Sequence, residues 1–297
     1  MSLIQQNTTL PYPLINIQHA IDNQAPTLDF VLPGLVVGTV GSIVAPGATG
    51  KSWFALQLAA IVGTGIDTMS LGFDGLKTGR VLLLAAEDPQ EVLWARLRAL
   101  SGRLAPEHRI NLIKNVDIAP CVGKSGDLSD DGLTANQIIQ CGKYRLIIID
   151  TLSRWHSGDE NSRKDAVLVM RNLEKVAIQT GAAIIFLHHT SKFAAINGQG
   201  AEQQASRGSG VWVDEARWVA YLKVATEVDA KLIDVSDNEL KKYVKFGVSK
   251  ANYCPPQAEV WLKRGFEGML ESVEIPTITA SLKYGEGKKR GYTTNDF

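Results

Sequence analysis

The chain has 297 residues, of which 45% are hydrophobic and 21% are charged. This composition is typical of a globular protein and excludes a fibrous or largely disordered chain. Basic and acidic residues number 31 each, so the formal net charge is +0, which argues against a protein that holds duplex DNA by bulk charge.

Targeting signals are not expected in this sequence. No uninterrupted apolar run is long enough to cross a bilayer, so no membrane partner is expected. The first residues have neither the basic nor the apolar segment of a secretory signal. The three cysteines, Cys121, Cys141 and Cys254, form no CxxC pair, which argues against a disulfide framework or a zinc site. We therefore expect a cytoplasmic protein.

Three regions follow one another along the chain. Residues 1–34 are rich in Gln, Asn and Pro and are expected to form an N-terminal arm. The arm is interpreted either as a disordered leader or as a segment that packs on a neighbouring subunit. A single ATPase domain is expected over residues 35–275, and residues 276–297 are expected to be a flexible tail.

The domain is expected to belong to the α/β class. Short apolar runs predict buried strands over residues 35–44, 80–88, 111–120, 145–150 and 182–189. Helices are expected over 51–63, after residue 88, and over 165–181. Strands that are apolar throughout and alternate with helices indicate a mostly parallel sheet covered on both faces. Three later segments predict an antiparallel extension of that sheet, at residues 211–224, 241–253 and 258–265.

The segment APGATGKS (45–52) joins a predicted strand to a predicted helix, which is the context of a phosphate-binding P-loop. Ala45 replaces the usual first glycine, but the later glycines still allow backbone N–H groups to turn inward around phosphates. Lys51 is expected to reach the β- and γ-phosphates of ATP, and the Ser52 hydroxyl to bind Mg²⁺. The expected nucleotide-binding residues are Gly47, Ala48, Thr49, Gly50, Lys51 and Ser52. The alternative is a glycine-rich turn before a helix.

Asp150 ends the apolar run LIIID. An acid at the carboxyl end of a buried strand faces the crevice in which open α/β sheets bind ligands. We expect Asp150 to be the second protein partner of Mg²⁺, although a carboxylate here can also cap the next loop.

Two acids end the strand RVLLLAAED. Glu87 comes first after the apolar run and is the expected base, which orients the water that attacks the γ-phosphate. Asp88 precedes Pro89 and is expected instead to cap the following helix.

His188 and His189 end the strand AIIFLHH. Adjacent strand residues point to opposite faces, so the two are not expected to bind one metal ion. His189 is expected to sense the γ-phosphate, and the role of His188 stays open.

These segments together resemble the RepA-type hexameric replicative helicases of broad-host-range plasmids, and more widely the RecA/DnaB-like superfamily. The resemblance spans about residues 27 to 265 and also rests on QQASRGSGVWVDEARW and FGVSKANY. It implies a RecA-like core and a homohexameric ring with ATP at the subunit interfaces. Five residues match the family's nucleotide-binding and catalytic positions: Lys51, Ser52, Glu87, Asp150 and His189.

The resemblance also implies residues that act on a neighbour's nucleotide. Arg217 matches the arginine finger, which would stabilise transition-state charge in trans, and Arg207 is the second candidate. DnaB-like relatives carry a Lys-x-Arg pair on a late strand. Here only Lys250 matches, because Asn252 stands at the arginine position. Relatives of this type also carry an N-terminal primase-binding domain, and only about 34 residues precede the core here.

Two segments are candidates for contact with single-stranded DNA. Residues 191–210 are rich in Gly, Gln and Ser and carry Lys192 and Arg207. Residues 153–164 carry Arg154 and Arg163. A few cations with backbone amides can follow a phosphate chain without reading bases, and a neutral ring needs only a few per subunit. The alternative for both segments is an ordinary surface loop.

The sequence therefore predicts an ATP- and Mg²⁺-dependent ring helicase that moves on single-stranded DNA during replication of a plasmid or other mobile element. Its expected partners are single-stranded DNA, further copies of itself, and a replication initiator or primase. The alternative is a RecA-like ATPase without helicase activity, such as a recombination or regulatory module. A P-loop kinase of small molecules fits less well, because no arginine-rich lid is evident.

Overall fold

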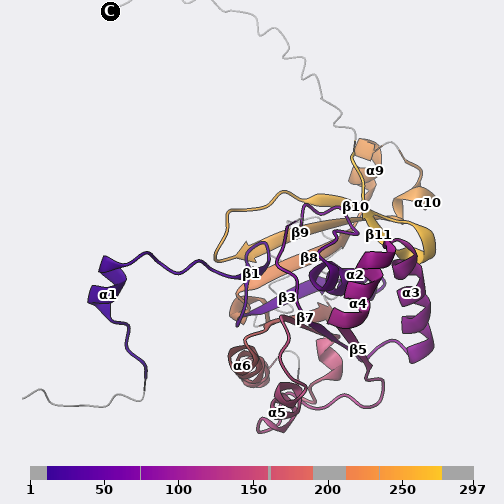
Figure 1. The fold of residues 1–297 in the computed structure, drawn as a ribbon. Helices are drawn as coiled ribbons and strands as arrows, with labels where there is room; N and C mark the ends of the chain where they lie inside the picture. Colours follow the sequence, from indigo (N-terminus) through magenta and orange to yellow (C-terminus); the bar gives the residue numbers. More distant parts are fainter. Residues whose placement is uncertain (1–11, 74, 160–161, 190–211, 234, 276–297) are drawn as a thin grey trace, which may run out of the picture.

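A nine-stranded sheet with the order β11-β10-β9-β8-β3-β7-β6-β4-β5 forms the centre of the molecule (Figure 1). The computed structural model describes residues 12–73, 75–159, 162–189, 212–233 and 235–275. The predicted tail, residues 276–297, therefore lies outside the described residues.

The sheet has a parallel part and an antiparallel part. The parallel strands are β3 (Val40–Ala45), β4 (Val81–Ala85), β5 (Val116–Pro120), β6 (Leu146–Asp150), β7 (Ala183–His189) and β8 (Trp218–Val224). The antiparallel strands are β9 (Tyr243–Ala251), β10 (Val260–Arg264) and β11 (Leu270–Ser272). The predicted fold class, a mostly parallel sheet with an antiparallel C-terminal extension, is confirmed.

Helices cover both faces of the sheet. One face carries α2 (Lys51–Thr64), α3 (Gln90–Gly102) and α4 (Pro106–Asn115), and the other carries α5 (Leu133–Gln140) and α6 (Arg163–Thr180) (Figure 1). In β6, Leu146 and Ile148 belong to the first core, whereas Ile147 and Ile149 belong to the second. Because successive strand residues point to opposite faces, a strand between two cores must be apolar throughout.

The N-terminal region differs from the predicted arm. Residues 30–34 do not belong to an arm, because β1 (Phe30–Leu32) pairs with β2 (Leu35–Val36), and Val31 and Leu32 are fully buried. Asp29 fixes this strand through Arg145, with 2.6 Å between Nη2 and Oδ1. A three-residue strand is too short to show a periodic pattern. Upstream, α1 (Ile17–Asp22) has no buried residue and lies apart from the sheet (Figure 1).

Three predicted strands have different bounds in the structure. The run 35–44 is two strands, because Gly38 forms a turn at φ +72°. The first half of the run 111–120 is helical and belongs to α4. In the run 211–224, residues 212–215 are helical before β8 begins. In each case tertiary packing sets the boundary, because apolar residues alone do not distinguish a short buried strand from the buried end of a helix.

Short helices complete the described chain. The first is η1 (Leu152–Arg154), directly after β6. Between β8 and β9 lie α9 (Glu227–Ile233) and α10 (Asp237–Leu240), and η2 (Phe266–Gly268) joins β10 to β11. Within the described ranges, no helix is long and apolar enough to span a membrane.

Candidate active site

Four neighbouring strands deliver the predicted catalytic residues to one edge of the sheet. The strands β3, β7, β6 and β4 are consecutive in the sheet and parallel. Ala45, the last residue of β3, is in register with His189, and Ala85 at the end of β4 is in register with Asp150. Since parallel strands end at the same edge, residues more than 100 positions apart in sequence become neighbours.

The P-loop leaves β3 and enters α2. Gly50 begins the helix at φ +99°, a left-handed conformation that glycine adopts without steric cost. Ala48 also has a positive φ of 61°. The fully buried Thr49 donates a hydrogen bond of 2.6 Å from Oγ1 to the Pro46 carbonyl. These contacts fix the turn that the predicted phosphate-binding segment requires.

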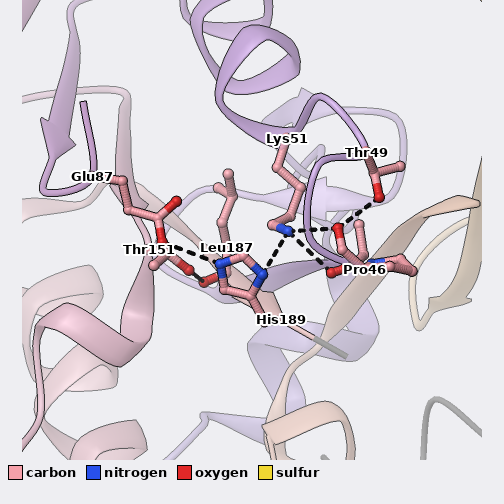
Figure 2. Close-up of polar contacts among 8 residues, drawn as sticks. Pro46, Thr49, Lys51, Glu87, Thr151, Leu187 and His189 are labelled. Carbon is pink, nitrogen blue, oxygen red and sulfur yellow. Dashed lines mark hydrogen bonds and ion pairs between the residues drawn. The ribbon is translucent and has the colours of Figure 1, made fainter. Parts of the chain in front are cut away.

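Lys51 points back along the P-loop (Figure 2). Its Nζ donates to the carbonyls of Ala45 and Pro46 at 3.1 and 3.0 Å and lies 3.0 Å from Nδ1 of His189. Burial lowers the pKa of Lys51 to about 8, and Glu87 and Asp150 oppose this shift electrostatically. An ammonium has three N–H donors, and these three acceptors use all of them.

His189 connects Lys51 to Glu87 (Figure 2). Its Nε2 lies 3.1 Å from Oε1 of Glu87. Because the Lys51 ammonium only donates, Nδ1 must accept, and the ring proton belongs on Nε2, where it is donated to Glu87. This hydrogen bond lowers the pKa of Glu87, so its carboxylate is ionised near neutral pH. The three side chains form one chain of hydrogen bonds beside the P-loop.

Asp150 lies at the end of β6, with 2% of its surface exposed. Burial raises its pKa to about 6, and a hydrogen bond with Ser52 opposes that shift. Its Oδ1 is buried and has no hydrogen-bond partner among the described residues. A buried carboxylate oxygen without a partner, next to a serine hydroxyl, fits the oxygen ligands that Mg²⁺ prefers. Ser52 and Asp150 are therefore suited to hold the ion.

Asp88 does not cap the next helix, contrary to the prediction. The residue at the N-cap of α3 is Pro89, and that end has no side-chain cap. Asp88 instead pairs with Arg96 of the same helix, and both side chains are about four-fifths buried. The nearby guanidinium provides a stronger partner than a helix N–H group does.

Arg217 and Lys250 lie at the opposite end of the sheet from the P-loop. The backbone N–H of Arg217 donates to Val40 at the start of β3, and its side chain is exposed. Lys250 pairs in register with Val219 of β8, and its Nζ donates to the carbonyl of Asp214 at 2.7 Å. Burial lowers the pKa of Lys250, as does the nearby Arg217. At about 3.3 Å per strand residue, this end lies roughly 15 Å or more from the P-loop of the same chain.

The candidate DNA-contacting residues are placed unequally. Arg154 and Arg163 are exposed, and Arg154 lies near enough to Glu87 to lower the pKa of that carboxylate. Lys192 and Arg207 lie outside the described residues. His188 faces away from His189 into the core, where it lies against the buried ring of Trp212, with 6.0 Å between ring centroids. Burial lowers the pKa of His188 to about 4, so it is neutral.

The C-terminal hairpin of β10, η2 and β11 adds two contacts that the sequence pattern did not indicate. Arg264 donates from Nη2 to the Ala48 carbonyl at 2.8 Å. Gln57 of α2 exchanges two hydrogen bonds with the backbone of Leu270, at 2.8 and 2.9 Å. More than 200 residues separate the partners in both cases, and neither belongs to a motif, so no local signal pointed to them.

Comparisons with known proteins agree with this geometry. The model of the family described as "AAA domain" matches residues 8–195. Among solved structures, the chain is similar to the ATPase domain of another protein, with TM-score 0.55, 16% identity, and coverage of 87% of this chain and 96% of that one. A DnaB-like replicative helicase, solved to describe its interactions with primase, gives the same TM-score and identity, with coverage of 87% and 67%. The RadB recombinase gives a TM-score of 0.50 at 14% identity, with coverage of 81% and 93%. These similarities establish a RecA-like fold.

Proposed function

Because the chain belongs to the AAA domain family, we propose that it hydrolyses ATP and uses the energy to drive a ring-shaped replicative DNA helicase. The ring is proposed to be a homohexamer of the RepA type that moves along single-stranded DNA during replication of a plasmid or other mobile element. Residues 35–275 would form the ATPase domain, with β1 added to it. The cytoplasm is the proposed location.

The observation that carries the proposal is the juxtaposition of Lys51, His189 and Glu87 beside the buried Asp150. A glycine-rich turn that only begins a helix needs none of these groups. The hydrogen-bonded chain and the unpartnered Asp150 oxygen support a site for phosphoryl transfer to water.

Each residue has a distinct role in the proposed hydrolysis. The backbone N–H groups of residues 47–52 would surround the phosphates, and Lys51 would contact the β- and γ-phosphates. Glu87 would accept a hydrogen bond from the attacking water and take its proton as the O–P bond forms. Ser52 and Asp150 would hold Mg²⁺, which when bound neutralises charge on the phosphate oxygens.

His189 would report whether the γ-phosphate is present. Lys51 has all three donors on protein acceptors, so it must release at least one of them to reach a phosphate. Release from Nδ1 of His189 removes the contact that orients the ring toward Glu87. The position of the histidine would then follow the nucleotide, and β7 leads directly into residues 190–211.

Arg217 and Lys250 would act on the nucleotide of an adjacent subunit. Their end of the sheet is too far from the P-loop of their own chain to contribute there, but in a ring it can face a neighbour. An arginine supplied in this way stabilises the transition state and makes hydrolysis depend on the interface.

The DNA strand would pass along residues 191–210, through Lys192 and Arg207, with Arg154 and Arg163 as second contacts. The similar helicase structure that describes a primase interaction supports primase, or a replication initiator, as a further partner.

A strand-displacement assay on a forked DNA substrate tests the function. The wild type is expected to displace the strand in the presence of ATP and Mg²⁺. The Lys51→Ala variant is expected to lose both displacement and hydrolysis, and wild-type hydrolysis in this variant would mean that the P-loop assignment is wrong.

The second candidate is a RecA-like ATPase that acts in recombination or regulation, favoured by the similarity to the RadB recombinase. Hydrolysis without displacement and without stimulation by single-stranded DNA would select this function. A monomer in a mass measurement would also count against the ring.

A further inference from the structure

We infer that Arg264, at the end of β10, is a positioning residue that fixes the nucleotide-binding conformation of the P-loop through the Ala48 carbonyl. The inference rests on the proposed ATPase function and adds to it a residue more than 200 positions away from the P-loop.

The guanidinium of Arg264 lies against the outer side of the P-loop. Its Nη2 donates to the Ala48 carbonyl at 2.8 Å, and its Nη1 donates to the Lys241 carbonyl at 3.3 Å. A Cβ atom built on Gly50 would lie 3.8 Å from Nε. Arg264 thus links the turn after α10 to the middle of the P-loop.

The direction of the next N–H group follows from this contact. The peptide bond between Ala48 and Thr49 is trans, because the cis bond of the described chain lies elsewhere. In a trans peptide the C=O and N–H groups point in opposite directions. Holding the Ala48 oxygen outward therefore directs the Thr49 N–H to the opposite side of the loop, where a phosphate would bind.

The P-loop needs this support because Ala48 has a positive φ of 61°. A residue with a Cβ atom is strained in that conformation, so contacts from its surroundings must hold it there. Thr49 and Lys51 hold the carbonyls of Ala45 and Pro46 from inside the loop. Arg264 holds the third carbonyl, that of Ala48, from outside it.

The hairpin that carries Arg264 is itself firmly attached to α2. Gln57 pairs with both backbone groups of Leu270, and all of these atoms are buried. The Trp53 ring lies against Gly268 in η2, where an added Cβ would meet it at 3.1 Å. The guanidinium is therefore delivered by a rigid element.

The charge of Arg264 is not neutralised by a carboxylate, since no ion pair joins it to an acid in the described part of the chain. Its Nε is also buried without a partner there. A positive charge in this setting favours an anionic ligand in the neighbouring P-loop.

Nucleotide-binding measurements on the full-length Arg264→Ala variant test the inference. P-loop N–H groups surround the α- and β-phosphates, which ATP and ADP share. Loss of one hydrogen bond from a charged donor is expected to weaken ATP and ADP alike, by about tenfold or more. This contact would be equal in the ground and transition states, so KM should rise while kcat stays within about twofold.

Lys263→Ala is the matched control. Lys263 is the adjacent residue of β10, and its ammonium contacts the Tyr243 ring and Glu239 instead of the P-loop. It removes the same charge from the same strand, and its nucleotide affinity should equal that of the wild type. If Arg264→Ala does not fold, Arg264→Lys replaces it, because lysine keeps the charge but cannot bridge both carbonyls. A several-fold loss for ATP and ADP alike is then expected.

Three outcomes would overturn the inference. Unchanged affinity would mean that the Ala48 contact does not matter, and a loss for ATP alone would mean that Arg264 contacts the γ-phosphate instead. An equal loss in Lys263→Ala would reduce the effect to bulk charge. If the wild type binds neither nucleotide, it is the proposed ATPase function that fails.

Discussion

At the scale of single residues, Lys51, His189 and Glu87 determine one another's hydrogen-bonding roles. Lysine can only donate, so Nδ1 of His189 accepts and Nε2 donates to Glu87. The protonation pattern that a catalytic base requires is therefore set by the P-loop lysine. A phosphate that competes for Lys51 would change this pattern, which gives His189 a physical basis for sensing.

Asp150 is expected to lower the stability of the fold in exchange for its metal-binding role. Its pKa is about 6 in the folded chain, against 3.8 for an unperturbed Asp. As pH rises from about 4 to 6, the unfolded state releases this proton more readily than the folded state does, so stability falls. The cost is complete above pH 6 and amounts to at most about 3 kcal/mol.

Asp150→Asn should therefore raise the melting temperature by a few degrees at pH 8 in EDTA, while hydrolysis is lost. The gain should shrink toward pH 4, where the wild-type carboxyl is protonated, and excess Mg²⁺ should stabilise only the wild type. Scanning calorimetry at both pH values measures this. A variant less stable than the wild type at pH 8 would contradict the expected burial penalty.

At the scale of elements, the ion pair of Asp29 determines where the core begins. Arg145, with 9% of its side chain exposed, binds both oxygens of Asp29 and the Phe30 carbonyl. Lys77 adds a third contact at 3.0 Å. These bonds fix β1, which otherwise has three residues and one partner strand.

Asp29→Asn is expected to lower the free energy of unfolding by about 1 kcal/mol at pH 7, a value reduced for the partial exposure of the pair. The hydrogen bond from Arg145 lowers the pKa of Asp29 to about 2. Its contribution is therefore complete above the unfolded value near 3.8 and is lost as pH falls toward 2.

Urea unfolding at pH 7 and at pH 3 measures this difference, which should be smaller at pH 3. Lys77→Ala is the control, because 71% of the Lys77 side chain is exposed and its pair should contribute less. Equal stability of Asp29→Asn and the wild type at pH 7 would show that the ion pair does not anchor β1.

At the scale of the whole molecule, the two ends of the parallel sheet carry complementary parts of the proposed site. The P-loop, Asp150 and Glu87 lie at one end, and Arg217 with Lys250 lies at the other. A closed ring repeats one interface, so each site would combine both ends from different subunits.

Mixed assemblies test this arrangement. Lys51→Ala and Arg217→Ala are each expected to hydrolyse almost no ATP, and Arg217→Ala should still bind it. When the two variants are co-expressed, some interfaces pair an intact P-loop with an intact Arg217. Up to roughly a quarter of wild-type turnover should return, since a quarter of random interfaces are intact.

A mixture of Lys51→Ala with the double variant has no intact P-loop and should stay inactive. Lys223→Ala, a change further along β8, should retain turnover on its own. Failure of the two single variants to complement each other would count against a site shared between subunits.

The sequence by itself determined the α/β class, the P-loop and the strand ends that carry Asp150, Glu87 and His189. These features are local, because a glycine-rich turn and an acid after an apolar run can be recognised within a few residues. Short β1 and the helical half of the run 111–120 were missed, because apolar content alone does not distinguish a short strand from the buried end of a helix.

Only the tertiary structure decided which of these residues meet. The hydrogen bonds of His189, the pairing of Asp88 with Arg96, and the contact of Arg264 with Ala48 join side chains through sheet order or packing. Sheet order is a property of the whole chain, because it depends on which strands share a core. No window of sequence contains it, and the proposed site exists because four strands end side by side.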